Sequence, residues 1–189
     1  TWQKTENLNG VSQGVRALLE SSNGTIYAGT GNNGDIFVKT TNSTGGIGWS
    51  NTGNLIHSGL DVSYVYSLLE SSNGTIYAGT ASGVFVKETN STGGIGWSRT
   101  GPIGLSDVNS LLESSNGTIY AGGSQGAGIF VKETNSTGGI GWSNTGGTVE
   151  GNVVSLLESS NGTIYAGTNG VSGTASGIFV KETNSTGGI

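Results

Sequence analysis

The residues best suited to chemistry stand at two positions that differ in every copy of an otherwise repeated sequence. The two sets are Arg16, Tyr66, Asn109 and Val154, and, two residues earlier in each copy, Gly14, Tyr64, Asp107 and Asn152. If they lie on strands, alternation of side chains places both sets on one side of the strand. A guanidinium, two phenols, an amide and a carboxylate together predict an asymmetric pocket for a sugar or a peptide. The alternative is drift at exposed positions that bind nothing.

Two further polar residues join this candidate set. His57 is the single histidine, and it stands in the longest variable stretch near Asp61. A neutral imidazole can serve as a general base or a metal ligand at ordinary pH. However, no calcium-loop spacing links Asp35, Asp61 and Asp107, and the chain has no cysteine. We therefore add His57 and Asp61 to the candidate ligand-binding residues. We expect no metal and no cofactor.

Composition excludes several classes of function. A net charge of -5 with 7 basic residues argues against a nucleic-acid footprint, which needs clustered Lys and Arg. No window approaches the roughly 18 apolar residues that a membrane span requires, so we expect a soluble chain. The sequence contains no Met and begins at Thr1, which indicates a processed, excised or engineered segment of unassigned compartment.

A repeat organises the whole chain. The sequence Ser-Ser-Asn-Gly-Thr-Ile-Tyr-Ala-Gly begins at Ser21, Ser71, Ser114 and Ser159. Four copies in 189 residues give a period of about 47, which suits a four-stranded propeller blade. The predicted blades cover residues 7–53, 54–101, 102–146 and 147–189 of a single domain, 1–189, with 1–6 as a closing strand.

Within one copy the apolar residues occur in short runs that are typical of β-strands. Strands are predicted at 65–69, 75–80, 84–88 and 96–100, and an Asn-Gly turn at Asn73 separates the first two. The predicted fold class is all-β: a four-bladed β-propeller in which each blade is an antiparallel meander. The loops before the first strand and between the second and third vary in length, so all length variation falls on one face, around the channel mouth.

Closure of the ring can be tested by counting. The separation from Phe to Trp is 12 residues in Phe37 to Trp49, and the same from Phe179 to Trp2 if Ile189 meets Thr1. The N-terminal strand is therefore expected to complete the last blade. We expect the recurring Trp to pack between blades. We expect the recurring glutamates, Glu70 among them, to be solvated or paired.

The stretch from Val65 to Thr80 resembles the short propeller repeats of bacterial two-component sensor ectodomains. The segment running into each Trp resembles the Asp-box, or bacterial neuraminidase, repeat, with Asn42, Thr44, Gly46 and Trp49 at its four defined positions. The second resemblance raises sialidase chemistry as an alternative, in which three arginines hold the substrate carboxylate. This chain has only Arg16 and Arg99, and it lacks suitably paired carboxylates. The resemblances thus imply a fold more than an activity.

The sequence favours a non-enzymatic binding or scaffold module, with a glycan or peptide ligand at the variable-loop face. One alternative is a designed or recently amplified propeller with no ligand, because near-identical copies indicate recent amplification or deliberate repetition. A glycan hydrolase is the third and disfavoured alternative. We expect a monomer, and the interchangeable repeats leave a strand-swapped dimer as the alternative.

Overall fold

The computed structural model describes residues 1–5, 8, 14–31, 34–57, 60–124, 128–147, 149–171, 173 and 175–181. Every regular element within these ranges is a β-strand, which confirms the predicted all-β class. In the same ranges no helix is long and apolar enough to cross a membrane. Two compact units make up the chain: Thr1–Ala81 with Phe85–Arg99, and Ser82–Val84 with Thr100–Ile189.

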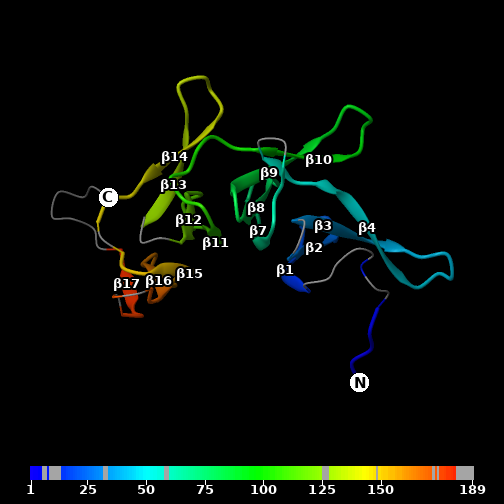
Figure 1. Cartoon of the computed structure of the whole chain (residues 1–189), viewed down its shortest axis with the longest axis horizontal. Helices are drawn as coiled ribbons and strands as arrows, with labels where there is room; N and C mark the ends of the chain where they lie inside the picture. The colour runs from blue at the N-terminus through cyan, green and yellow to red at the C-terminus, as the bar shows by residue number, and fades with distance from the viewer. Residues whose placement is uncertain are drawn as a thin grey trace. The chain divides into compact units, whose positions relative to one another are not determined.

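The first unit contains the first two meanders, apart from two residues of β9 (Figure 1). The first sheet has the order β1 (Val15–Glu20), β2 (Ile26–Thr30), β3 (Asp35–Thr41) and β4 (Ile47–Asn54). The next sheet contains β7 (Val65–Glu70), β8 (Ile76–Thr80), β9 (Gly83–Thr89) and β10 (Ile95–Arg99). Along the chain, a short hairpin of β5 (Ile56–His57) and β6 (Leu60–Asp61) comes between these two sheets.

The second unit contains the other two meanders. One sheet has the order β11 (Val108–Glu113), β12 (Ile119–Gly123), β13 (Ile129–Thr134) and β14 (Ile140–Asn144). The last sheet holds β15 (Asn152–Glu158), β16 (Ile164–Asn169) and β17 (Ile178–Val180). Each strand pairs antiparallel with its neighbour in sequence, as the apolar runs predicted, because short turns connect them.

Closure of the last blade by the N-terminal segment stays a prediction. Residues 1–5 are described outside any strand, and the described part of the last sheet has three strands. No turn joins the segment to β17, so pairing of the two would depend on long-range contacts, whereas a hairpin is favoured by its own short loop.

The turn between the first two strands of each sheet is stabilised by its own side chains. In the second sheet, Asn73 Oδ1 accepts hydrogen bonds from Ser71 Oγ at 2.7 Å and from the Thr75 amide at 3.0 Å. Gly74 has a φ of 81°, in the left-handed region where a side chain is strained. The same bonds form at Asn23, Asn116 and Asn161. The repeated Ser-Ser-Asn-Gly sequence thus specifies this turn locally.

Apolar side chains fill the space between adjacent sheets. In the first unit Phe85, Ile36 and Val65 are fully buried in one cluster, and Trp97 packs against it. A Cβ on Gly29 would lie 2.5 Å from Val65 Cγ1, so the sheets approach closely only because residue 29 has no side chain. The predicted packing of Trp between blades is therefore what the first unit shows for Trp97.

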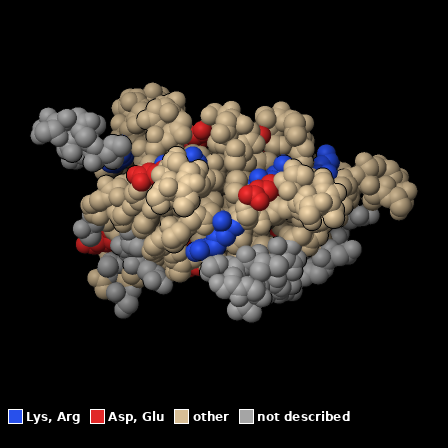
Figure 2. Space-filling view, turned by 90° about the horizontal axis from the view of Figure 1, so that it is seen from above, with Lys and Arg blue, Asp and Glu red and all other residues tan. Residues whose placement is uncertain are grey.

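Polar bridges supplement this apolar contact. The Glu70 carboxylate accepts hydrogen bonds from the amide of Ser22 at 2.6 Å and from its hydroxyl at 2.9 Å, which joins the second sheet to a turn of the first. Glu158 makes the same two bonds to Ser115 in the second unit. The two carboxylates are thus paired, which was the expectation for the repeated glutamates. Charged side chains are otherwise sparse, and on the face seen in Figure 2 most of the surface is uncharged.

Candidate ligand-binding site

The candidate residues Arg16, Tyr66 and Asn109 each stand at a β-bulge. In each of the four meanders the register of the first two strands shifts at this point, between Val15 and Ala17 in the first sheet and between Val65 and Ser67 in the second. A bulge leaves its extra residue unpaired and re-aims its side chain. Strict alternation, used in the sequence analysis, therefore does not hold along the whole innermost strand. The residue that varies between copies is the bulge residue, whose side chain is constrained least by the hydrogen-bonded pairing of the two strands.

The first unit brings three candidates together, which we call the arginine–tyrosine cluster: Arg16, Tyr64 and Tyr66. The two phenol rings are stacked, with centroids 5.7 Å apart and an interplanar angle of 19°. The Arg16 guanidinium carbon lies 4.9 Å from the Tyr64 ring centroid and 5.8 Å from that of Tyr66. Cation–π attraction and ring stacking therefore orient all three groups without a buried ion pair.

Backbone contacts position this cluster at the edge of the two innermost strands. Tyr64 forms an isolated antiparallel bridge with Gly31, which follows β2 of the neighbouring sheet, and its carbonyl accepts a hydrogen bond from the Ala81 amide at 3.0 Å. Arg16 is exposed, while both tyrosines are half-buried. The cluster is thus a fixed aromatic platform with an accessible cation beside it.

The second unit contains Asp107, Asn109 and Asn152, each half-buried. Asp107 Oδ2 accepts a hydrogen bond of 2.9 Å from Ser124 Oγ, and this hydroxyl also accepts one from the Asp107 amide at 3.2 Å. Asn109 Nδ2 donates to the Val153 carbonyl at 3.1 Å, which links β11 to β15. Asn152 is the first residue of β15. At Asp107 and Asn109 these bonds stabilise loops and sheet contacts.

The remaining candidates lie on the short hairpin. His57 ends β5 and Asp61 ends β6, where His57 pairs with Leu60 and Ile56 with Asp61. Their side chains lie outside the described part of the structure. Among the residues whose side chains are described, no group of three or more His, Cys, Asp or Glu could hold a metal ion.

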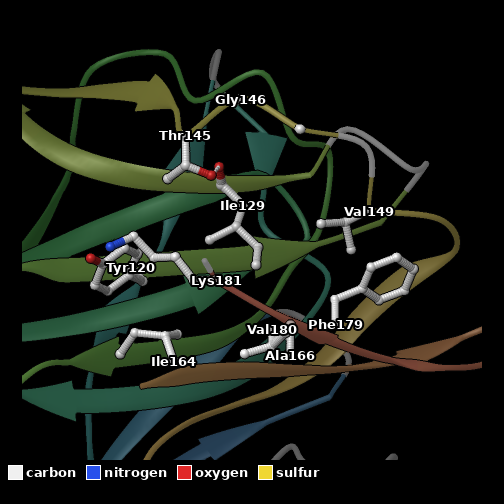
Figure 3. A pocket seen from close by; sticks show the side chains of 11 residues that line it. Tyr120, Ile129, Thr145, Gly146, Val149, Ile164, Ala166, Phe179, Val180 and Lys181 are labelled. Atoms are coloured by element: carbon white, nitrogen blue, oxygen red, sulfur yellow. Dashed lines mark hydrogen bonds between the residues drawn. The ribbon is translucent and has the colours of Figure 1, made fainter. Parts of the chain in front are cut away.

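Sequence reasoning missed an apolar pocket of about 400 Å³ in the second unit (Figure 3). Its lining includes Tyr120 and Ile129 from one sheet and Ile164, Ala166 and Phe179 from the next. Four of these five residues are the same in every copy, and Ile129 is replaced only by a valine in the second, so a search for residues that break the repeat could not find them.

Solved structures with similar folds come from several kinds of protein. The extracellular domain of a one-component system from B. thetaiotaomicron matches with a TM-score of 0.64 and 21% identity, over 90% of this chain and 22% of that chain. Virginiamycin B lyase from Staphylococcus aureus matches with a TM-score of 0.54 and 16% identity, over 97% and 60%. A 6-phosphogluconolactonase from Bacteroides uniformis matches with a TM-score of 0.64 and 17% identity, over 94% and 52%.

These similarities concern the fold alone, and the chain spans between about a fifth and three fifths of the length of these proteins. No curated protein is similar to it in sequence. Together with the four antiparallel sheets, the structural matches confirm the predicted four-bladed β-propeller class. The resemblance to sensor ectodomain propellers is supported, whereas the Asp-box assignment stays a prediction. The Tachylectin family model matches residues 1–184, and the chain therefore belongs to the Tachylectin family.

Proposed function

We propose that this protein is a non-enzymatic, lectin-like propeller that binds a glycan at the arginine–tyrosine cluster. The observation that carries the proposal is the stacked pair Tyr64 and Tyr66 with Arg16 across the rings, at positions that differ between otherwise repeated sheets. Membership of the Tachylectin family is consistent with this function.

The chemistry of the cluster suits a sugar. The face of a pyranose ring that carries C–H groups packs on an aromatic surface, and two stacked phenols provide such a surface at low entropic cost. The Arg16 guanidinium carries five N–H donors and is exposed beside the rings, so it can donate to sugar hydroxyl or carboxylate oxygens.

Cellular location follows from the same reasoning. Glycans that a non-enzymatic lectin recognises are mostly displayed outside the cytoplasm, and one of the similar folds is an extracellular sensor domain. We place the protein in an extracytoplasmic compartment. The chain has no cysteine, so its stability there depends on the propeller packing and not on disulfides.

A glycan array with matched variants tests the proposal. We expect Tyr66→Ala and Arg16→Ala each to weaken binding of the recognised glycan at least about tenfold, since each removes a central contact of the site. Val154→Ala is the matched control, because Val154 is 48% exposed and occupies the same bulge position in β15. Lys87→Ala is a second control on a repeated position.

The outcomes separate the proposal from its alternatives. Binding that all four variants retain would place the glycan elsewhere and refute the cluster as the site. An array with no bound glycan, followed by a peptide library that selects ligands sensitive to Tyr66→Ala, would favour a peptide-binding module. Failure of both screens would support the ligand-free scaffold.

A further inference from the structure

The Arg16 side chain extends from β1 toward the second sheet. Its guanidinium carbon lies over the ring of Tyr64 at 4.9 Å and over that of Tyr66 at 5.8 Å, both at the start of β7. The bulge residue of the third sheet reaches the following sheet in the same way, because Asn109 Nδ2 donates to the Val153 carbonyl. The position of Arg16 is therefore set by a contact between neighbouring sheets of one unit, and this contact recurs in the other unit.

The charge of Arg16 is not neutralised within the described part of the chain. No carboxylate among the described residues forms an ion pair with the guanidinium, and its partners there are the two phenol rings. Glu20 stands four residues away on the same strand, about 13 Å, which exceeds the Debye length of about 8 Å at physiological ionic strength. The Glu70 carboxylate at the end of β7 is already bound to Ser22. A phenol ring has a quadrupole but no net charge, so one positive charge remains at the cluster.

Arg16 is the one charged residue at its repeat position. Its counterparts in the other copies are Tyr66, Asn109 and Val154. The chain as a whole has a net charge of -5, with 12 acidic and 7 basic residues. Such a chain repels anions over most of its surface, so an anion is attracted only where a local cation outweighs the net charge. The cluster provides that cation beside an aromatic surface.

The arrangement of the cluster suits an anion that is bonded directly to a ring. A carboxylate paired with a guanidinium lies about 2.7–2.9 Å from its nitrogen atoms, and here that position is directly beside the phenols. In hexuronates and sialates the carboxylate is bonded to a carbon of the pyranose ring. One such sugar can therefore reach Arg16 with its carboxylate and a phenol with the apolar face of its ring.

A single guanidinium suits one carboxylate better than a polyanion. Highly sulfated chains are bound by clustered Lys and Arg, whereas residues 14–20 and 64–70 contain Arg16 as their only basic residue. The planar fork of the guanidinium matches the two oxygens of a carboxylate with two parallel hydrogen bonds.

We infer that the arginine–tyrosine cluster selects sugars that carry a carboxylate, hexuronates or sialates, over neutral sugars of the same shape. Arg16 is the specificity-determining residue, since it pairs with the carboxylate. Tyr64 and Tyr66 supply a contact that acidic and neutral sugars share. The inference rests on the proposed glycan-binding function and names its class of ligand.

An array of paired glycans tests this selectivity. The two members of a pair have the same linkage: glucuronate with glucose, galacturonate with galactose, a sialate with its methyl ester, and a sulfated sugar with its unsulfated form. We expect the parent protein to bind the carboxylate member about fivefold more tightly, the upper end for an exposed ion pair, because the phenols already orient the guanidinium. The preference should fall toward one in about 1 M salt, where the Debye length is about 3 Å. The uronate and sialate pairs identify which of the two sources carries the recognised group.

Three variants assign the preference to the cluster. Arg16→Gln should lower the ratio of acidic to neutral binding to about one, because glutamine keeps N–H donors and loses the charge. Arg99→Gln is the matched control: it changes the net charge equally, and Arg99 lies in β10, so the ratio should stay at about fivefold. Tyr66→Ala should weaken binding of both members of a pair, because the ring contact is common to them. Unchanged melting temperatures for the two arginine variants confirm that both remain folded.

The outcomes distinguish this inference from the proposed function. If Tyr66→Ala weakens binding while the parent protein binds both members of every carboxylate pair within about twofold, the cluster is a site for neutral glycans and the inference is wrong. An equal loss of preference in Arg16→Gln and Arg99→Gln would attribute the selectivity to net charge and also overturn it. A preference that depends on Arg16 but appears only in the sulfated pair would show that the carboxylate is not the recognised group. Binding that Tyr66→Ala leaves unchanged would instead refute the proposed site itself.

Discussion

Substitution of alanine for Gly122 tests the packing between sheets. Gly122 in β12 and Gly167 in β16 occupy the same repeat position and follow the same residues, Ile-Tyr-Ala. A Cβ on Gly122 would lie 2.3 Å from Val153 Cγ1 and 2.8 Å from Val153 Cβ, on the neighbouring sheet. A Cβ on Gly167 would meet only Ser155, with the hydroxyl oxygen at 2.6 Å and Cβ at 3.9 Å.

The two substitutions are expected to differ in free energy of unfolding. Val153 is fully buried and cannot rotate away, so the added methyl on residue 122 overpacks the space, at a cost of about 1–3 kcal/mol. The lower entropy of the unfolded chain returns about 0.4–1 kcal/mol. We therefore expect Gly122→Ala to lower the free energy of unfolding by about 1–2 kcal/mol. Ser155 is exposed and its hydroxyl can rotate, so Gly167→Ala should keep the entropic gain and should not lower the free energy of unfolding, raising it by at most about 1 kcal/mol.

Urea unfolding followed by Trp fluorescence measures both variants. The midpoint of Gly122→Ala should shift to lower urea with an unchanged slope, because the surface exposed on unfolding stays the same. A double variant, Gly122→Ala/Val153→Ala, removes the clashing methyl groups. Its destabilisation should be smaller than the sum of the two single effects by about 1–2 kcal/mol.

Equal midpoints for Gly122→Ala and Gly167→Ala would refute this reasoning. That result would mean that the close approach of Val153 is not what requires a glycine, and that the local Ile-Tyr-Ala-Gly sequence sets the requirement instead. Strict additivity in the double variant would lead to the same conclusion, because residues in contact should couple.

Two further predictions concern a titration and a turn. Burial, reinforced by the negative charge of Glu70, raises the pKa of Tyr27 above its ordinary value of 10.0. The unfolded chain therefore loses this proton first, and the free energy of unfolding should fall as pH rises above about 10. Urea unfolding of Tyr27→Phe and of the parent protein, each compared with its own value at about pH 8, should show a smaller loss of unfolding free energy in the variant above about pH 10. An equally steep loss in both would contradict the raised pKa of Tyr27. Asn135 Oδ1 accepts hydrogen bonds from the Thr137 amide at 3.0 Å, the Thr137 hydroxyl at 2.8 Å and the Gly139 amide at 2.8 Å. Asn135→Ala should lower the melting temperature. Asn135→Asp keeps the acceptor oxygen but loses the Nδ2 donor to the Ile140 carbonyl at 3.3 Å, so it should restore part of the loss. No difference between the two variants would show that the acceptor oxygen is not the stabilising group.

The repeated sequence made most of the fold predictable. The Ser-Ser-Asn-Gly turn satisfies its own hydrogen bonds, and the β-branched and aromatic runs on either side of it are strong strand formers. The predicted strands 65–69 and 96–100 therefore agree with β7 and β10 to within one residue at each end. The closing strand stays a prediction, because nothing local joins residues 1–5 to β17 and their pairing would depend on long-range contacts alone.

The candidate site was predictable only in part. Variation between copies indicated Arg16, Tyr64 and Tyr66, and the structure shows that stacking and cation–π contact hold them together. The β-bulge at Arg16 and Tyr66 was not visible in the sequence, since one extra residue in a strand leaves the apolar pattern nearly unchanged. Asp107 was chosen by the same variation, yet its carboxylate accepts a hydrogen bond from Ser124, which follows β12 of the same sheet.

Local sequence thus determined the strands, their turns and the register of each meander, because those depend on neighbours a few residues away. Tertiary structure decided which identical residues are buried. Ile36 and Ile178 occupy the same repeat position, but one is fully buried and the other is 80% exposed. The physical reason is that burial depends on a second surface, and each sheet gains that surface only from the sheet packed against it.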